Sequence, residues 1–161
     1  AALGLRLLQE GQDTALARIL KARFLSPTAR VSIGRALAVR HLATAMIDVS
    51  DGLLQDLGHL CEASGVGVVI EAPSLPLSPE YFALLGEREW TLTLTGGEDY
   101  ELLFTVPTER QAEIAVIAER EQCRVTRIGR IVAHAEGVRV YGSDGKIYTP
   151  AQTGYDHFRQ A

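Results

Sequence analysis

The sequence has few cysteines and histidines and no long apolar run. Its two cysteines, Cys61 and Cys123, lack the spacing of a zinc site, so we expect both to be reduced core residues. The four histidines are scattered, and no apolar run approaches the roughly 18 residues of a membrane span. No basic, cleavable leader is recognised at the start of the sequence. We therefore expect a cytoplasmic protein with no membrane partner.

Positive charge is also scarce. The chain has 16 Lys and Arg against 20 Asp and Glu, which gives a formal net charge of −4. This balance argues against nucleic acid as a partner and fits a site that works through cations. At 161 residues with 47% hydrophobic content, the chain is long enough to bury a core as a single domain.

The most informative stretch is an apolar strand that runs into an acidic turn and then a helix. Over residues 45–49 the side chains alternate between two faces, which places Asp48 at the rim of an otherwise apolar strand. From Gly52 onward, leucines recur every three or four residues, as in an amphipathic helix that begins at Ser50 or Asp51. A strand, an acidic turn and a helix N-terminus together suit phosphates bridged by a metal.

Two explanations compete for the polar residues of this turn. Ser50 and Asp51 are common helix N-caps, and that explanation stays open for either residue alone. Asp48 precedes any cap position and would be costly to bury without a cation. Because Mg²⁺ keeps waters and substrate phosphates in its coordination shell, two carboxylates are enough as ligands from the protein. We predict that Asp48 and Asp51 bind one divalent metal.

The remaining periodicities predict an α+β fold, a mixed β-sheet with helices. A hairpin is expected around Gly142 to Gly145, and Thr108 with Gln111 forms a capping-box pattern at a helix start. Ser78 followed by Pro79 indicates the start of a short helix. The expected helices cover residues 3–10, 14–25, 32–41, 52–64, 81–85 and 108–121, and the expected strands cover 45–49, 67–71, 124–132, 138–141 and 146–148.

A second stretch, residues 91–106, places Gly96-Gly97-Glu98-Asp99 between two β-rich runs. A turn at the two glycines is expected, although residues 89–94 could also be the end of a helix. The glycines would let the backbone approach a ligand with two acids beside it. From spacing alone a plain hairpin with a solvated acidic turn is the favoured interpretation.

The C-terminal segment carries Tyr155 and Phe158 in a polar setting. Terminal aromatic residues usually dock on the core, and the alternative is a flat face for a ligand ring or cation. The sequence does not decide which of the two would face a ligand.

Three motifs together resemble the C-terminal half of the thiamine-monophosphate kinase family. Residues 48–53 (D-V-S-D-G-L) match its D-I-S-D-G-L, residues 96–104 match its G-G-E-D-Y-E-L-L-F, and residues 154–158 are similar to its closing G-aromatic-x-H-F. The first motif is shared with the wider aminoimidazole-ribonucleotide-synthetase-like superfamily, and the second is more specific. The resemblance implies that superfamily's C-terminal domain fold, partly ferredoxin-like.

The resemblance also implies an activity and residue roles. The family transfers the ATP γ-phosphoryl group to thiamine monophosphate, giving thiamine diphosphate, with Mg²⁺. Asp48 and Asp51 would be metal ligands, Ser50 would contact ATP, and Glu98 with Tyr155 would contact thiamine monophosphate. Tyrosine at 155 departs from the tryptophan that is common there but keeps an aromatic face.

The family's N-terminal ATP-binding domain has no counterpart in residues 1–161, which we expect to be a single C-terminal domain. A homodimer is implied for the full-length protein, and this chain alone is expected to fold but not to catalyse. Two alternatives remain. One is another ATP-using enzyme of the superfamily, of the selenophosphate or aminoimidazole ribonucleotide synthetase type, and the other is a non-catalytic binding fragment.

Overall fold

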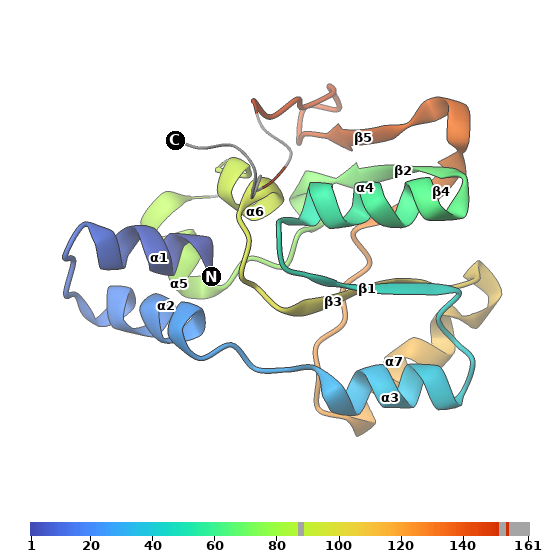
Figure 1. Cartoon of the computed structure of the whole chain (residues 1–161), viewed down its shortest axis with the longest axis horizontal. Helices are drawn as coiled ribbons and strands as arrows, with labels where there is room; N and C mark the ends of the chain where they lie inside the picture. The colour runs from blue at the N-terminus through green and yellow to red at the C-terminus, as the bar shows by residue number, and fades with distance from the viewer. Residues whose placement is uncertain (87–88, 152–153, 155–161) are drawn as a thin grey trace.

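The computed structural model describes residues 1–86, 89–151 and 154, and its helices are interspersed with short strands (Figure 1). None of the helices in these ranges is long and apolar enough to cross a membrane. The helices are α1 (Ala2–Gln9), α2 (Ala15–Leu25), α3 (Val31–Val39), α4 (Leu53–Ser64), α5 (Pro79–Leu85), α6 (Thr91–Thr95) and α7 (Gln111–Arg120). The strands are β1 (Ala45–Val49), β2 (Val66–Glu71), β3 (Glu101–Thr105), β4 (Gly129–Ala133) and β5 (Val138–Tyr141).

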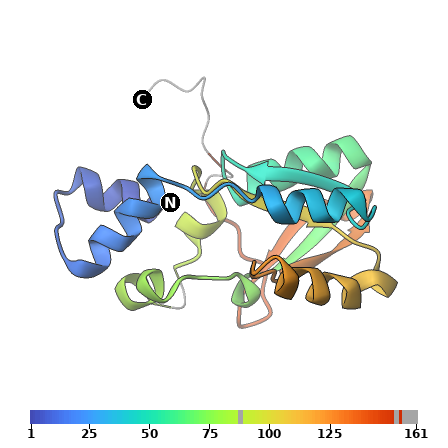
Figure 2. The ribbon, with the colours of Figure 1, turned by 90° about the horizontal axis from the view of Figure 1, so that it is seen from below.

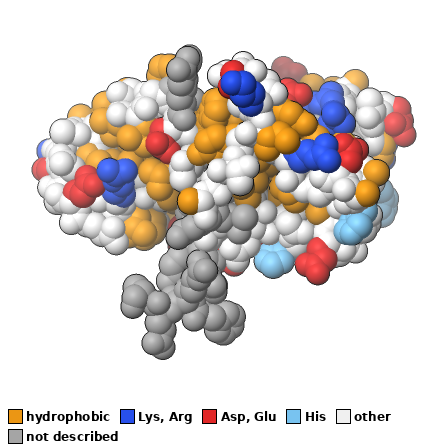
Figure 3. All heavy atoms as spheres, turned by 90° about the horizontal axis from the view of Figure 1, so that it is seen from above, with side chains coloured by type: hydrophobic (Ala, Val, Ile, Leu, Met, Phe, Trp, Pro, Cys, Tyr) orange, Lys and Arg blue, Asp and Glu red, His pale blue; other side chains and the backbone are white. Residues whose placement is uncertain are grey.

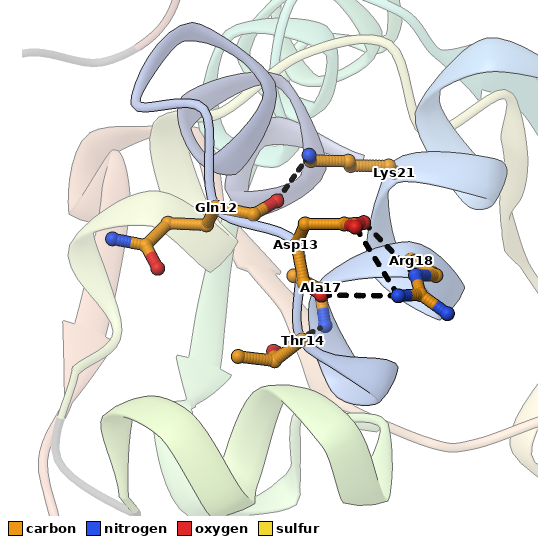
Figure 4. Close-up of polar contacts among 6 residues, drawn as sticks. All are labelled: Gln12, Asp13, Thr14, Ala17, Arg18 and Lys21. Atoms are coloured by element: carbon orange, nitrogen blue, oxygen red, sulfur yellow. Dashed lines mark hydrogen bonds and ion pairs between the residues drawn. The ribbon is translucent and has the colours of Figure 1, made fainter.

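Local sequence signals explain where several helices begin. The Thr14 side chain caps α2 by accepting the Ala17 N–H at 3.1 Å, and Arg18 pairs with Asp13 in the same turn (Figure 4). Ser78 caps α5 in the same way, with 3.2 Å from its oxygen to the Tyr81 nitrogen. These caps satisfy N–H groups that have no partner inside the helix.

The described strands form two sheets. β1 pairs antiparallel with β3, so that Asp48 lies opposite Leu102 and Val49 lies opposite Glu101. The second sheet has the order β4-β2-β5, in which β2 is antiparallel to β4 and parallel to β5. The α+β class with mixed pairing is confirmed, with the described strands divided between two sheets.

Seen from below, α1 and α2 lie at one end of the molecule and the strands at the other (Figure 2). Three apolar clusters hold the helices and strands together. The largest joins α4 to Val49 of β1, to β2 and to Val140 of β5. A second lies between α1, α2 and Tyr81 of α5, and a third packs α3 and α7 against Met46 and Phe104 of the β1–β3 pair. Helix α4 therefore contacts both sheets, and the turn before it connects α4 to β1.

Two predictions about local structure are wrong. Residues 91–95 are a helix, not a strand, which agrees with the alternative that they end a helix. A helix directs Leu94 into the α4 cluster and Leu92 toward the α1–α2 cluster, whereas a strand would put both on one face. The capping box at Thr108 is absent, because that residue begins a 3₁₀ turn (Thr108–Arg110) and α7 follows from Gln111.

The C-terminal strand predictions are confirmed in part. The expected strand 124–132 is restricted to β4, at Gly129–Ala133. The hairpin expected after β5 forms a single bridge between Tyr141 and Ile147.

Candidate functional site

The acidic turn connects β1 to α4 at residues 48–52. Asp48 is exposed at the end of β1, and Ser50 and Asp51 are half-buried in the turn. No hydrogen bond or ion pair within the described residues uses the Asp48 carboxylate, which is free to bind a ligand from solvent. The predicted strand-to-helix junction is confirmed.

Neither Ser50 nor Asp51 caps α4, so that interpretation of the turn is wrong. The N-cap residue of α4 is Gly52, so no side chain at this position accepts an N–H group of the first turn. The φ angle of Gly52 is 126°. A Cβ at this residue would lie 2.8 Å from the carbonyl oxygen of Thr95. Glycine is required here both by the backbone angle and by the close approach of α6.

The turn is held instead by Asp56, one turn into α4. Its Oδ2 accepts the backbone N–H groups of Ser50, Asp51 and Gly52 at 2.9, 3.1 and 3.3 Å. Asp56 is 3% exposed and is the one charged side chain that is buried among the described residues. Three N–H donors offset the cost of burying this carboxylate.

The Gly96-Gly97-Glu98-Asp99 segment packs against the same turn. The Glu98 N–H donates to the Ser50 carbonyl at 2.7 Å, and the Tyr100 N–H donates to the Val49 carbonyl at 2.8 Å. A Cβ at Gly97 would collide with the Ser50 carbonyl oxygen. The expectation of a plain, solvated hairpin is therefore wrong, because this segment is fixed on the acidic turn by backbone contacts.

Glu98 and Tyr100 add side chains to the acidic turn. The Tyr100 hydroxyl donates a hydrogen bond to Oε2 of Glu98 at 3.1 Å. This bond is the main cause that raises the pKa of Tyr100 above its ordinary value, and the nearby carboxylates of Asp48 and Asp51 raise it further. The hydroxyl thus lies within electrostatic reach of three carboxylates from two distant parts of the chain.

The C-terminal segment reaches this region at Gly154. A Cβ there would lie 2.6 Å from the Gln55 Cβ and 2.8 Å from the Asp51 carbonyl oxygen, so the backbone passes directly over the start of α4. Tyr155 and Phe158, the two candidate aromatic residues, lie outside the described residues.

The donor set fits a hard divalent cation only with ligands from elsewhere. No group of three or more His, Cys, Asp or Glu side chains within the described ranges could hold a metal by itself. Asp48 and Asp51 offer carboxylate oxygens, which Mg²⁺ prefers, and phosphates and waters would complete its shell. The guanidinium of Arg30 does not neutralise the carboxylates of Asp48 and Asp51, because it forms a bidentate ion pair with Glu101 at 2.6 and 2.7 Å.

A hollow of about 470 Å³ lies beside the site, between α4 and the β5 region, and is lined by residues that include Gln55, His59 and Tyr148. Its lining includes none of the described residues predicted for the site, Asp48, Ser50, Asp51 and Glu98.

Sequence reasoning missed Asp56 and Tyr100. A signal for Asp56 was present, because helical spacing puts it beside Leu53, Leu57 and Leu60 on the apolar face of α4. An acid on an apolar face demands buried partners. Tyr100 had no such local signal, because its role depends on the approach of the two segments.

Known proteins match over nearly the whole chain. A family model described as AIR synthase related protein, C-terminal domain, matches residues 6–142. Thiamine-monophosphate kinase of Salmonella typhimurium strain LT2 is 38% identical over 164 residues, which cover 98% of this chain and 49% of that protein. The chain spans about half the length of the curated relatives it matches.

Two solved structures share the fold at similar identity. Thiamine-monophosphate kinase from Stenotrophomonas maltophilia K279a has a TM-score of 0.79 and 40% identity, covering 90% of this chain and 46% of that one. A structure described as AaThiL complexed with AMPPCP and TMP has a TM-score of 0.77 and 36% identity, covering 98% of this chain and 47% of that one.

Proposed function

The chain belongs to the AIR synthase related protein family, C-terminal domain, and on that premise we propose that it is the C-terminal half of a thiamine-monophosphate kinase. The reaction would transfer the γ-phosphoryl group of ATP to thiamine monophosphate and give thiamine diphosphate. The observation that carries the proposal is the backbone junction of the two acidic motifs, at Ser50 with Glu98 and at Val49 with Tyr100. The relative complexed with AMPPCP, an ATP analogue, and TMP supports both substrates.

Asp48 and Asp51 are proposed to hold Mg²⁺. Phosphoryl transfer between two anions depends on positioning and charge neutralisation, and bound Mg²⁺ supplies the neutralising charge. The exposed Asp48 carboxylate and the Asp51 carboxylate, three residues on, supply oxygen donors at the edge of β1. Without a cation, these two carboxylates and Glu98 would repel anionic substrates.

Ser50 is proposed to contact ATP, and Glu98 with Tyr155 to contact thiamine monophosphate. Glu98 has one carboxylate oxygen engaged by Tyr100, which leaves the other oxygen for a ligand donor. Gly154, the residue before Tyr155, lies against the start of α4, and this contact supports the proposal. An aromatic side chain there would suit a cationic thiazolium ring.

A preceding domain is proposed to complete the site. The exposure of Asp48 and Glu98 and the lack of a three-ligand metal group in the described ranges both support a contribution from elsewhere. We call the full-length product that contains this chain the parent protein, and propose that it is a cytoplasmic homodimer.

On the face drawn in Figure 3, the described Lys and Arg side chains lie beside Asp and Glu, which supports small-molecule substrates over nucleic acid.

The parent protein tests the proposal directly. Thiamine diphosphate should form from ATP and thiamine monophosphate only when Mg²⁺ is present. Asp48→Ala and Asp51→Ala should each abolish this turnover and leave the circular dichroism spectrum unchanged. Asp144→Asn, which changes an exposed acid paired with Lys146 after β5, should retain it. Normal turnover by both alanine variants at limiting Mg²⁺ would exclude the metal assignment.

The isolated 161-residue chain tests the proposal that a preceding domain is needed for turnover. It should unfold cooperatively, because it has its own apolar clusters, but should form no thiamine diphosphate. Turnover by this chain at the rate of the parent protein would contradict the need for a second domain. A parent protein that binds both substrates without turnover would favour a non-catalytic binding role.

A further inference from the structure

Asp56 is bonded to the same peptide groups that receive the Glu98 segment. The peptide group between Val49 and Ser50 donates its N–H to Asp56 Oδ2 at 2.9 Å, and its carbonyl accepts the Tyr100 N–H at 2.8 Å. The next peptide group donates the Asp51 N–H to Asp56 at 3.1 Å, and its Ser50 carbonyl accepts the Glu98 N–H at 2.7 Å. In each of these two consecutive peptide groups, the N–H donates to Asp56 and the carbonyl oxygen accepts from the Glu98–Tyr100 segment.

Through these two peptide groups, the charge of the Asp56 carboxylate affects both the acidic turn and the Glu98–Tyr100 segment. A negative charge at the N–H end of a peptide group polarises it and strengthens the hydrogen bond that its carbonyl accepts. The carbonyls in question receive the N–H groups of Glu98 and Tyr100, whose φ values of 68° and 49° are unfavourable for side chains of their size. The bonds from the acidic turn therefore help to hold a strained segment in place.

The burial of Asp56 separates it from the ligand-binding groups. Its side chain is 3% exposed and lies on the inner face of α4, whereas Asp48 and Glu98 are exposed. The Oδ2 atom of Asp56 is occupied by three N–H donors, and the 3% exposed side chain has little access to substrate or metal. We therefore expect Asp56 to act on the reaction through the backbone that it holds.

We propose that Asp56 is a positioning residue that couples the metal side of the site, residues 48–51, to its substrate side, residues 98–100. The assignment of the two sides rests on the proposed kinase function, whereas the coupling of the two segments does not. The inference distinguishes Asp56 from residues that serve one ligand only. Loss of its charge should disturb both sides at once.

The test uses Asp56→Asn and Asp56→Ala in the parent protein, with Asp144→Asn as the control for loss of a remote carboxylate. Asp56→Asn keeps one acceptor oxygen but loses the charge, and we expect the half-saturating Mg²⁺ concentration and the KM for thiamine monophosphate each to rise about tenfold. Asp56→Ala should show larger increases in both, so that asparagine partly rescues the alanine defect. Asp144→Asn should leave both constants unchanged.

Two outcomes would overturn the coupling. One is a fall in melting temperature with both constants unchanged, which would give Asp56 a structural role only. The other is a rise in one constant without the other, which would confine Asp56 to one side of the site.

A measurement on the unmutated parent protein keeps the inference testable if both variants fail to fold or if the protein lacks kinase activity. The amides of Ser50, Asp51, Glu98 and Tyr100 should exchange hydrogen through one shared opening, with equal protection. Independent, much faster exchange at Glu98 and Tyr100 would overturn the coupling. Absence of thiamine diphosphate formation by the parent protein would instead count only against the proposed function.

Discussion

The Tyr100 hydroxyl donates a hydrogen bond to Oε2 of Glu98, and both residues have left-handed backbone angles. Such angles cost free energy for side chains of this size and persist where the surroundings fix them. Here the two residues are fixed by their N–H bonds to the carbonyls of Ser50 and Val49. The strain is therefore located where the two acidic motifs meet.

Tyr100→Phe in the parent protein should weaken binding of thiamine monophosphate. The change removes the hydroxyl that orients Glu98 and keeps the aromatic ring, so that packing is retained. We expect the KM for thiamine monophosphate to rise about fivefold, with the KM for ATP unchanged. Steady-state kinetics with each substrate varied in turn would measure both constants.

Tyr148→Phe provides the matched control for that substitution. Its hydroxyl also makes one side-chain hydrogen bond, with Thr91 at 2.7 Å, and makes none with Glu98. This variant should keep both KM values. An equal rise in the KM for ATP and for thiamine monophosphate in Tyr100→Phe would argue against a substrate-specific role.

The titration of Tyr100 should depend on Glu98. The hydrogen bond to the carboxylate favours the neutral phenol and raises its pKa. Because the folded-state pKa lies above the unfolded value of about 10, the stabilisation is complete below pH 10 and is lost as the pH rises through the folded-state pKa. The absorbance change at about 295 nm in wild type minus Tyr100→Phe would report this pKa, since phenolate absorbs there.

Glu98→Gln should bring the pKa of Tyr100 back toward its ordinary value, because it removes the charge next to the hydroxyl. Glu136→Gln, a change at the distant Arg139 ion pair, serves as the control. An unchanged titration curve in Glu98→Gln would contradict the contact.

Gly97→Ala should destabilise the fold where the two motifs touch. The added methyl group would collide with the Ser50 carbonyl oxygen, which cannot move without breaking its bond to the Glu98 N–H. We expect a loss of about 1–3 kcal/mol in the free energy of unfolding, measured by urea denaturation.

Gly58→Ala is the matched glycine control for Gly97→Ala. A Cβ at Gly58 would have no neighbour within 4 Å, and the residue lies inside α4. Alanine there should stabilise the protein by up to about 1 kcal/mol, because it favours the helix. Similar destabilisation by both substitutions would show that the close approach at Gly97 is not the cause.

Gly154→Ala should impair binding of thiamine monophosphate if the segment after Gly154 contributes Tyr155 to the site. The new Cβ would overlap Gln55 and the Asp51 carbonyl and so displace the backbone from α4. The KM for thiamine monophosphate should rise several-fold, as it should in Tyr155→Ala, while Tyr155→Trp should be tolerated because it keeps a ring face. A normal KM in Gly154→Ala would separate this contact from substrate binding.

The sequence alone predicted the elements whose causes are local. The change from two-residue to three- and four-residue apolar spacing predicted β1 and α4, and Ser78 followed by Pro79 predicted the start of α5. The motifs around Asp48 and Glu98 also indicated the family. These signals act within a few residues, so no tertiary contact is needed to interpret them.

The tertiary structure decided the features that depend on distant segments. Residues 91–95 are helical because Leu92 and Leu94 pack into two different clusters, which local β-propensity could not anticipate. The turn at Ser50 is held by Asp56 and receives the Glu98 N–H because β1 pairs with β3 and α4 folds back on both. Hydrogen bonds between remote peptide groups form only where the fold brings their donors and acceptors within about 3 Å, and spacing along the chain does not encode that distance.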